Sequence, residues 1–239
     1  MIDFKALRVV PPPAKVAYFK GLKGFTLAEV LITLGIIGIV AAMTMPALVG
    51  KYRDQVLITQ SKKTFSTISN AFNSLKAESG YSDYSVIFEN SSEQVLNDLT
   101  KYIQVTQNCG TKNGCWAKGT KPQKNSGESY NFYTSHAQAK AILLDGATIA
   151  IMSYNTRNVG GNCLSKFDSG TTDADGNPIY NYSNQCGLIF FDTNGEKGPN
   201  QYGADTFSFI INPDKIIQYQ GDFYDAITGN TLNYEMITK

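Results

Sequence analysis

The sequence predicts an α+β fold in which one long N-terminal helix packs on a C-terminal antiparallel β-sheet. No charged residue occurs from Val30 to Val49, and apolar residues then recur at helical spacing to about residue 79. Apolar runs separated by short turns follow from residue 140 onward. After the apolar segment about 190 residues remain, which is enough for one domain with its own core.

The first half of the helix, residues 25–50, has the length and composition of a membrane span. About 20 apolar residues in a helix cross the roughly 30 Å hydrocarbon core of a bilayer. Glu29 is the only acid in this block and stands near its start. Because a carboxylate in lipid is costly, Glu29 must either lie at the membrane edge or find a basic partner. Pro46 removes one backbone hydrogen bond and should kink or loosen the helix.

Residues 1–24 have the composition of a basic leader. They include five basic residues and the run Pro11-Pro12-Pro13, which cannot occupy a helix interior. The apolar block follows this leader, so removal of the leader would leave the anchor in the mature chain, unlike removal of a secretory signal. An uncleaved signal anchor with the same topology is the alternative. Removal of the leader changes the formal net charge from +1 to −3 and leaves no basic patch, so we expect no nucleic-acid partner.

The stretch Gly24-Phe25-Thr26-Leu27-Ala28-Glu29 resembles the processing signature of type IV prepilins and type II secretion pseudopilins. In that family Gly precedes the cut, Phe is the first mature residue, Glu is the fifth, and many helices carry a proline where Pro46 stands. The resemblance extends to about Tyr52. It implies a pilin-like fold, cleavage after Gly24 by prepilin peptidase, and N-methylation of Phe25.

The same resemblance implies a role for Glu29 in assembly. In the family, this Glu pairs with the N-terminal amine of a neighbouring subunit, here the amine of Phe25. Two opposite charges near an apolar phase neutralise each other, which favours a defined axial register between helices. The implied partners are copies of the chain and related pilins in a filament, prepilin peptidase, an inner-membrane assembly platform, and membrane lipid before assembly. A lone interfacial Glu without a partner is the alternative.

The leading interpretation is therefore a structural subunit of a type IV pilus or a type II secretion pseudopilus. The resemblance implies a single-pass inner-membrane protein with an extracytoplasmic C-terminal domain, which becomes a cell-surface or periplasmic filament after assembly. A membrane-anchored extracellular binding protein that does not polymerise is the alternative from a different class. We expect no enzymatic activity, because the sequence contains no nucleophile elbow, phosphate loop or dinucleotide fingerprint, and its only histidine is His136.

Residues 51–239 should form the globular domain, beginning with an amphipathic helix at residues 51–79. Its buried face is expected to contain Ile58, Phe65, Ile68, Phe72 and Leu75. Gly80 should end this helix. The variable region at residues 80–139 should hold a serine-capped helix near residues 92–99 and a surface loop at residues 106–130. Trp116 in that loop should cover it against the domain, with a contact role as the alternative.

Residues 140–239 should form the sheet. Strands are expected at residues 141–144, 147–152, 187–191, 206–211 and 215–219. The first two are joined by Asp145-Gly146, a strong hairpin signal. Short connections imply antiparallel pairing. The polar stretch at residues 155–185 is expected to be a long loop.

The four cysteines predict disulfides. Cys109, Cys115, Cys163 and Cys186 form an even set in a chain with the features of an exported protein. We favour the pairs Cys109–Cys115 and Cys163–Cys186 among the three possible pairings. A zinc site is the alternative, but its usual closely spaced cysteine pairs are absent.

The segment from Asp192 to Asn200, with Asp205 beyond it, is a candidate calcium site. Oxygen-bearing side chains at alternate positions, followed by glycine, suit Ca²⁺, which takes 6–8 oxygen ligands. The candidate ligands are Asp192, Asn194, Glu196 and Asp205. Some pseudopilins bind calcium in loops of their C-terminal sheet, so the resemblance favours this interpretation. The alternative is a turn-rich loop in which these residues make local hydrogen bonds.

Overall fold

The computed structural model describes residues 24–112, 114–116, 119–120, 138–155, 163–229 and 231–234. Most of the leader, residues 1–23, and His136 lie outside these residues. The chain divides into two compact units, Met1–Leu48 and Val49–Lys239, and we describe each by itself.

Helix α1, Leu27–Glu78, is a continuous helix of 52 residues that passes through Pro46. This confirms the single long helix expected from the apolar pattern. The helix ends where Gly80 takes a φ of 69° and Tyr81 donates its N–H to the Lys76 carbonyl. A glycine in the left-handed region leaves the helix without steric cost, so Gly80 acts as the expected stop.

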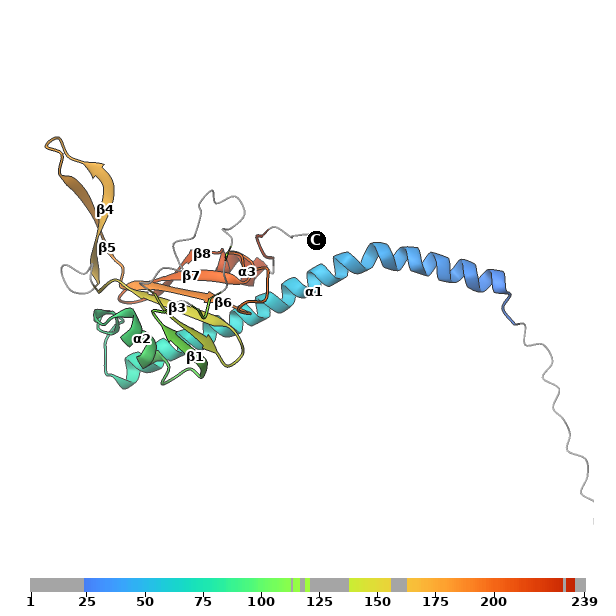
Figure 1. The fold of residues 1–239 in the computed structure, drawn as a ribbon, viewed down its shortest axis with the longest axis horizontal. Helices are drawn as coiled ribbons and strands as arrows, with labels where there is room; N and C mark the ends of the chain where they lie inside the picture. The colour runs from blue at the N-terminus through green and yellow to red at the C-terminus, as the bar shows by residue number, and fades with distance from the viewer. Residues whose placement is uncertain are drawn as a thin grey trace, which may run out of the picture. The chain divides into compact units, whose positions relative to one another are not determined.

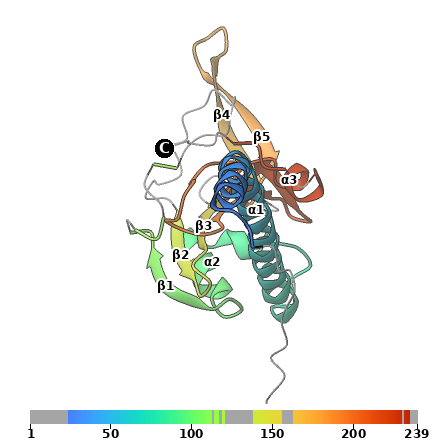
Figure 2. The same ribbon diagram turned by 90° about the vertical axis from the view of Figure 1, so that its right-hand side faces the viewer.

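The globular unit is built on a six-stranded antiparallel sheet in the order β1-β2-β3-β6-β7-β8 (Figures 1 and 2). Its strands are β1 Val105–Gly110, β2 Ala139–Leu143, β3 Thr148–Ser153, β6 Gly187–Asp192, β7 Thr206–Ile211 and β8 Ile216–Gln220. The remaining elements are η1 Ile87–Glu89, α2 Ser92–Leu99, β4 Leu164–Thr172, β5 Pro178–Asn184 and α3 Phe223–Gly229. An antiparallel sheet with a long helix on it is the predicted class.

Both faces of the sheet carry a hydrophobic core. On one face, the second half of α1 and α2 pack on alternate residues of β3 and β6, such as Ile149 and Phe191. The expected α1 face is confirmed here, and Phe72 is fully buried. On the other face, Phe190 and Trp116 belong to a second, smaller cluster. Because β3 and β6 are buried on both faces, their sequences read as uninterrupted apolar runs rather than alternating ones.

The sheet begins earlier in the chain than predicted. The region expected to be a surface loop at residues 106–130 starts with β1, which pairs with β2 at the edge of the sheet. Its pairing contains two register shifts, and half of its residues are exposed. An edge strand of this kind needs backbone partners but no apolar alternation, so the hydrophobic pattern could not reveal it.

The stretch expected to be a long loop at residues 155–185 contains a β-hairpin instead. Strands β4 and β5 pair with each other in a separate two-stranded sheet, and Figure 1 shows this arm projecting from the main sheet. The turn at its tip is held by Asp173, whose Oδ1 accepts the backbone N–H of Asp175 at 3.0 Å and of Asn177 at 2.8 Å. The arm is polar and exposed, so it lacks the apolar signal of a strand.

The two disulfides have the pairing that we favoured. Cys109 is bonded to Cys115, and Cys163 is bonded to Cys186 across the base of the β4–β5 arm. Trp116, beside the first bridge, is 7% exposed and donates its Nε1–H to Thr120 Oγ1 at 3.1 Å. Trp116 therefore covers its loop against the domain.

Candidate functional site

The start of α1 is organised by a reciprocal pair of residues, Thr26 and Glu29. Glu29 Oε2 accepts the backbone N–H and the hydroxyl of Thr26, each at 2.8 Å, while Thr26 Oγ1 accepts the Glu29 N–H at 3.2 Å. This is a capping box, in which two orphan donors at a helix N-terminus are satisfied by side chains. In the part of the chain that the structure describes, Glu29 Oε1 receives no hydrogen bond. One carboxylate oxygen thus remains available to a donor from outside the chain.

The helix that follows is apolar on every side. No residue from Gly24 to Val49 is buried, and Phe25 is 87% exposed. Within α1 an 18-residue window is long and apolar enough to cross a membrane, and none of it is buried. A helix that is hydrophobic all round needs lipid or other apolar helices as its surroundings.

Residues 20–45 match the family model described as the prokaryotic N-terminal methylation motif. The chain carries the signature of type IV prepilins and pseudopilins. No curated protein and no solved structure matches the chain. The signature indicates a structural protein, and together with one apolar N-terminal helix it fits a membrane-anchored, single-pass protein with a C-terminal domain. The prepilin signature covers only the N-terminal part, so the globular unit must be interpreted from its own structure.

The loop between β6 and β7 brings two of the predicted calcium ligands together in the interior. Asp192 and Asp205 are both fully buried. Asp192 accepts the Thr206 hydroxyl at 2.9 Å and the Asn194 N–H at 3.1 Å. Burial and the nearby charge of Asp205 raise the pKa of Asp192 well above its usual range.

Asp205 is the centre of the same loop. Its two carboxylate oxygens accept the backbone N–H groups of Gln201 at 2.8 Å and Asn200 at 2.9 Å. Burial raises its pKa to about 6, although these hydrogen bonds act in the opposite direction. Two neighbouring buried carboxylates leave this loop with an excess of acceptor oxygens and a high cost for ionisation.

The other two predicted ligands differ from each other. Glu196 is exposed, whereas the Oδ1 atom of Asn194 is buried without a hydrogen-bond partner. The Oδ1 atom of Asn200, which was not a predicted ligand, is also buried without a partner. The carboxamide nitrogens of these two asparagines donate to the carbonyls of Gly198 and Glu196, each at 3.4 Å. The loop therefore contains two orphaned amide oxygens and two buried carboxylates, and oxygen atoms of both kinds are ligands that Ca²⁺ uses.

Carboxylates alone do not form a metal site in this loop. In the described part of the chain, no group of three or more His, Cys, Asp or Glu side chains could hold a metal ion. A metal site in this loop would therefore also need the amide oxygens of Asn194 and Asn200. The sequence interpretation did not include Asn200 among the ligands. Its position in the same polar run, eight residues after Asp192, was the only available signal.

A hydrogen-bond chain that the sequence did not predict connects this loop to α1. Thr193 donates its hydroxyl to the Asp205 carbonyl at 2.8 Å, and Ser61 Oγ on α1 lies 2.9 Å from Thr193 Oγ1. Both side chains are buried. The conformation of the loop is therefore tied directly to the helix that packs on the sheet.

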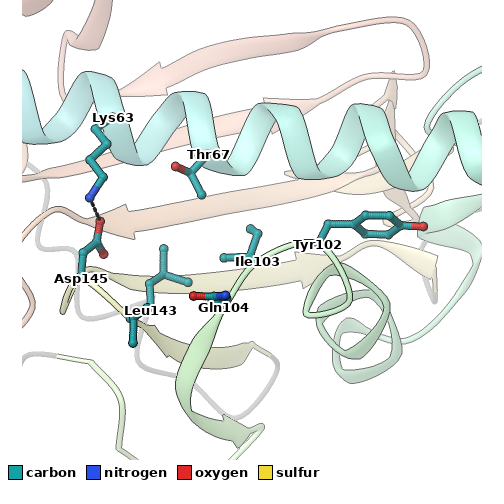
Figure 3. Close-up of a pocket in the computed structure, with 8 residues that line it drawn as sticks. Lys63, Thr67, Tyr102, Ile103, Gln104, Leu143 and Asp145 are labelled. Carbon is teal, nitrogen blue, oxygen red and sulfur yellow. Dashed lines mark ion pairs between the residues drawn. The ribbon is translucent and has the colours of Figure 1, made fainter.

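A second candidate site is a cavity of about 350 Å³ between α1 and the β2–β3 hairpin (Figure 3). Lys63 and Thr67 line it from α1, and Asp145 lines it from the hairpin turn. Lys63 Nζ lies 2.9 Å from Asp145 Oδ2, as the dashed line in Figure 3 marks. Since the one base and the one acid of this lining neutralise each other, the cavity offers no unpaired charged group for catalysis.

Proposed function

We propose that the chain is the precursor of a filament subunit, cut after Gly24 and assembled through the apolar half of α1. The observation that carries this proposal is the methylation signature at residues 20–45, which overlaps the start of a helix with no buried residue before Gly50. In a filament, neighbouring apolar helices would replace the lipid around α1. The globular units would then form the outer layer.

The geometry of Glu29 supports a role in that assembly. Thr26 occupies Oε2 and fixes the carboxylate at the first turn of α1, while Oε1 keeps its acceptor sites. A cut after Gly24 would give Phe25 a free amine that a neighbouring subunit could present to Oε1. Without each other, the Glu29 carboxylate and the Phe25 amine would be unpaired charges in an apolar assembly, so their pairing would favour one axial register.

The filament is a type IV pilus or a type II secretion pseudopilus, and the globular unit is extracytoplasmic in either case. Two disulfides in this unit support that placement, because disulfides persist in oxidising compartments. A membrane-anchored binding protein that stays monomeric is the competing function. It needs the same helix and domain but has no use for a Glu in the span.

Peptide mapping of the protein from its native host tests the processing step. We expect the mature chain to begin at Phe25 and to carry the added mass of one methyl group. A chain that still begins at Met1 would contradict the proposal.

Glu29→Gln tests assembly. The variant should reach the membrane and fold normally but should form few or no filaments, as judged by electron microscopy of sheared fractions. Glu89→Gln, a change of the same kind at an exposed position of the globular unit, is the matched control and should assemble normally. If Glu29→Gln assembles as well as the control, the result would contradict the assembly role of Glu29 and favour the competing function, a membrane-anchored binding protein.

We also propose that the β6–β7 loop binds one Ca²⁺. Asp192, Asp205 and the orphaned amide oxygens of Asn194 and Asn200 are the donors that support this proposal. A divalent cation would satisfy those amide oxygens and remove the repulsion between the two carboxylates.

Calorimetric titration of Ca²⁺ into the metal-free protein tests the site. We expect one site whose heat disappears in Asp205→Asn. Asp173→Asn, in the exposed turn at the tip of the β4–β5 arm, is the control and should leave the heat unchanged. No heat in the unchanged protein would remove the calcium proposal and leave the filament proposal intact.

A further inference from the structure

The β4–β5 arm and the main sheet border a cavity of about 330 Å³ that is open to solvent. It is lined by Tyr154, Phe167, Asn181, Gln185, Leu188, Ile210 and Tyr219. The arm contributes Phe167 and Asn181, which are directly opposed across β4 and β5 and so share a face of the hairpin. The cavity is large enough for a small ligand, since binding pockets are typically about 300–1,000 Å³.

The walls of this cavity are held in place by covalent and hydrogen-bonded contacts. The Cys163–Cys186 disulfide crosses the base of the arm, next to Gln185. Ser165 donates its hydroxyl to the Gln185 carbonyl at 2.8 Å. The Tyr154 and Phe167 rings meet edge to face, with centroids 5.5 Å apart, and join the arm to the sheet. A cavity whose walls are fixed in this way binds without a large ordering cost.

The lining combines flat apolar surfaces with uncharged polar groups. Tyr154, Phe167 and Tyr219 supply aromatic rings, and no lining residue is charged. The side-chain polar groups of Asn181, Gln185 and Tyr219 make no hydrogen bond within the part of the chain that the structure describes. Each carboxamide can donate and accept, and the Tyr219 hydroxyl can do both.

This combination selects one chemical class of ligand. A charged ligand would lose its hydration without gaining a counter-charge from the walls. A purely apolar ligand would cover the carboxamides and leave them without hydrogen-bond partners. A proline-rich peptide would need an extended groove rather than a single cavity. We propose that this cavity binds a neutral pyranose sugar, whose apolar ring face would lie on the aromatic walls and whose hydroxyls would meet Asn181, Gln185 and Tyr219.

Saturation-transfer NMR on the full chain in phosphatidylcholine nanodiscs tests this proposal. The probes are cellotriose, maltotriose and the trimer of N-acetylglucosamine, all of them neutral. We expect at least one probe to receive saturation from the protein. For that probe, Asn181→Ala and Tyr219→Ala should each weaken binding about tenfold, which corresponds to about 1.4 kcal/mol.

Tyr182→Ala is the matched control. Tyr182 is 58% exposed and stands next to Asn181 on β5, so its side chain lies on the opposite face of the arm. It should bind the probe normally. All three positions are exposed, so unchanged melting temperatures should show that the variants fold.

Three results would overturn the proposal. No saturation of any neutral trisaccharide would exclude the ligand class. An equal loss of binding in Tyr182→Ala would place the sugar on the outer face of the arm. Displacement of a bound sugar by a proline-rich decapeptide would assign the cavity to a peptide instead.

Discussion

The buried carboxylates of the β6–β7 loop should make the metal-free protein less stable as the pH rises from about 4 to about 6. Burial raises the pKa of Asp205 from 3.8 to about 6, so in this range the folded state binds more protons than the unfolded state. The free energy of unfolding then falls with rising pH. At about 1.36 kcal/mol for each pKa unit, Asp205 accounts for a loss of about 3 kcal/mol. The raised pKa of Asp192 acts in the same direction.

Urea denaturation in the presence of EGTA measures this effect. Trp116 is the only tryptophan and is buried in the second core, so its fluorescence should report unfolding of the globular unit. Asp83 and Asp173, whose pKa values are lowered by hydrogen bonds, lose their contribution only below about pH 4, outside this range. Asp205→Asn should flatten the slope, whereas exposed Asp214→Asn should not.

A free energy of unfolding that stays constant or rises between about pH 4 and about pH 6 would refute this reasoning. The effect of added Ca²⁺ distinguishes the burial of the two carboxylates from their role in metal binding. Saturating Ca²⁺ at about pH 7 should raise the urea midpoint, because a ligand that binds only the folded state stabilises it. If Ca²⁺ has no effect but the pH slope is present, the carboxylates are buried without a metal role.

Three further predictions concern the anchor, the core and the arm. Glu29→Gln should leave the urea midpoint of the globular unit unchanged while reducing filament yield, because Glu29 belongs to the other compact unit. Phe72→Ala should cost about 3–5 kcal/mol in the same denaturation assay, against less than about 0.5 kcal/mol for exposed Tyr182→Ala. Replacing Cys163 and Cys186 with serine should cost about 3 kcal/mol, since the bridge closes a loop with a sequence separation of 23; no loss of stability would show that the arm unfolds independently.

Elements that bury a continuous apolar surface could be predicted from the sequence. The α1 face repeats Ile58, Phe65 and Phe72 at helical spacing, and the four central positions of β3 and of β6 are all apolar. Elements held by backbone pairing alone were missed. Strand β1 at the sheet edge exposes half of its residues and the β4–β5 arm exposes most of them, so neither carries a periodic signal.

The candidate sites show the same limit. Alternating oxygen side chains identified Asp192 and Asp205, but their burial depends on neighbours that the sequence does not reveal. Asp192 pairs with Thr148 on β3 and with Thr206 on β7. Because it has a neighbouring strand on each side, its carboxylate is buried. The cavity beside the arm draws residues from five separate strands and from Tyr154 and Gln185 outside them, so only the fold could bring them together.

The contact between Ser61 and Thr193 implies that the β6–β7 loop and α1 respond to each other. Ser61 Oγ donates to the Leu57 carbonyl at 2.8 Å and also lies 2.9 Å from Thr193 Oγ1, so this hydroxyl joins the backbone of α1 to the loop residue that donates to the Asp205 carbonyl. Ser61→Ala removes this contact and should cost about 1 kcal/mol. Amide exchange at Thr193 should then become faster, whereas Ser66→Ala on the exposed side of α1 should leave it unchanged. Unchanged exchange in Ser61→Ala would mean that the loop keeps its conformation without help from α1, and calcium binding there could not influence how the helix packs.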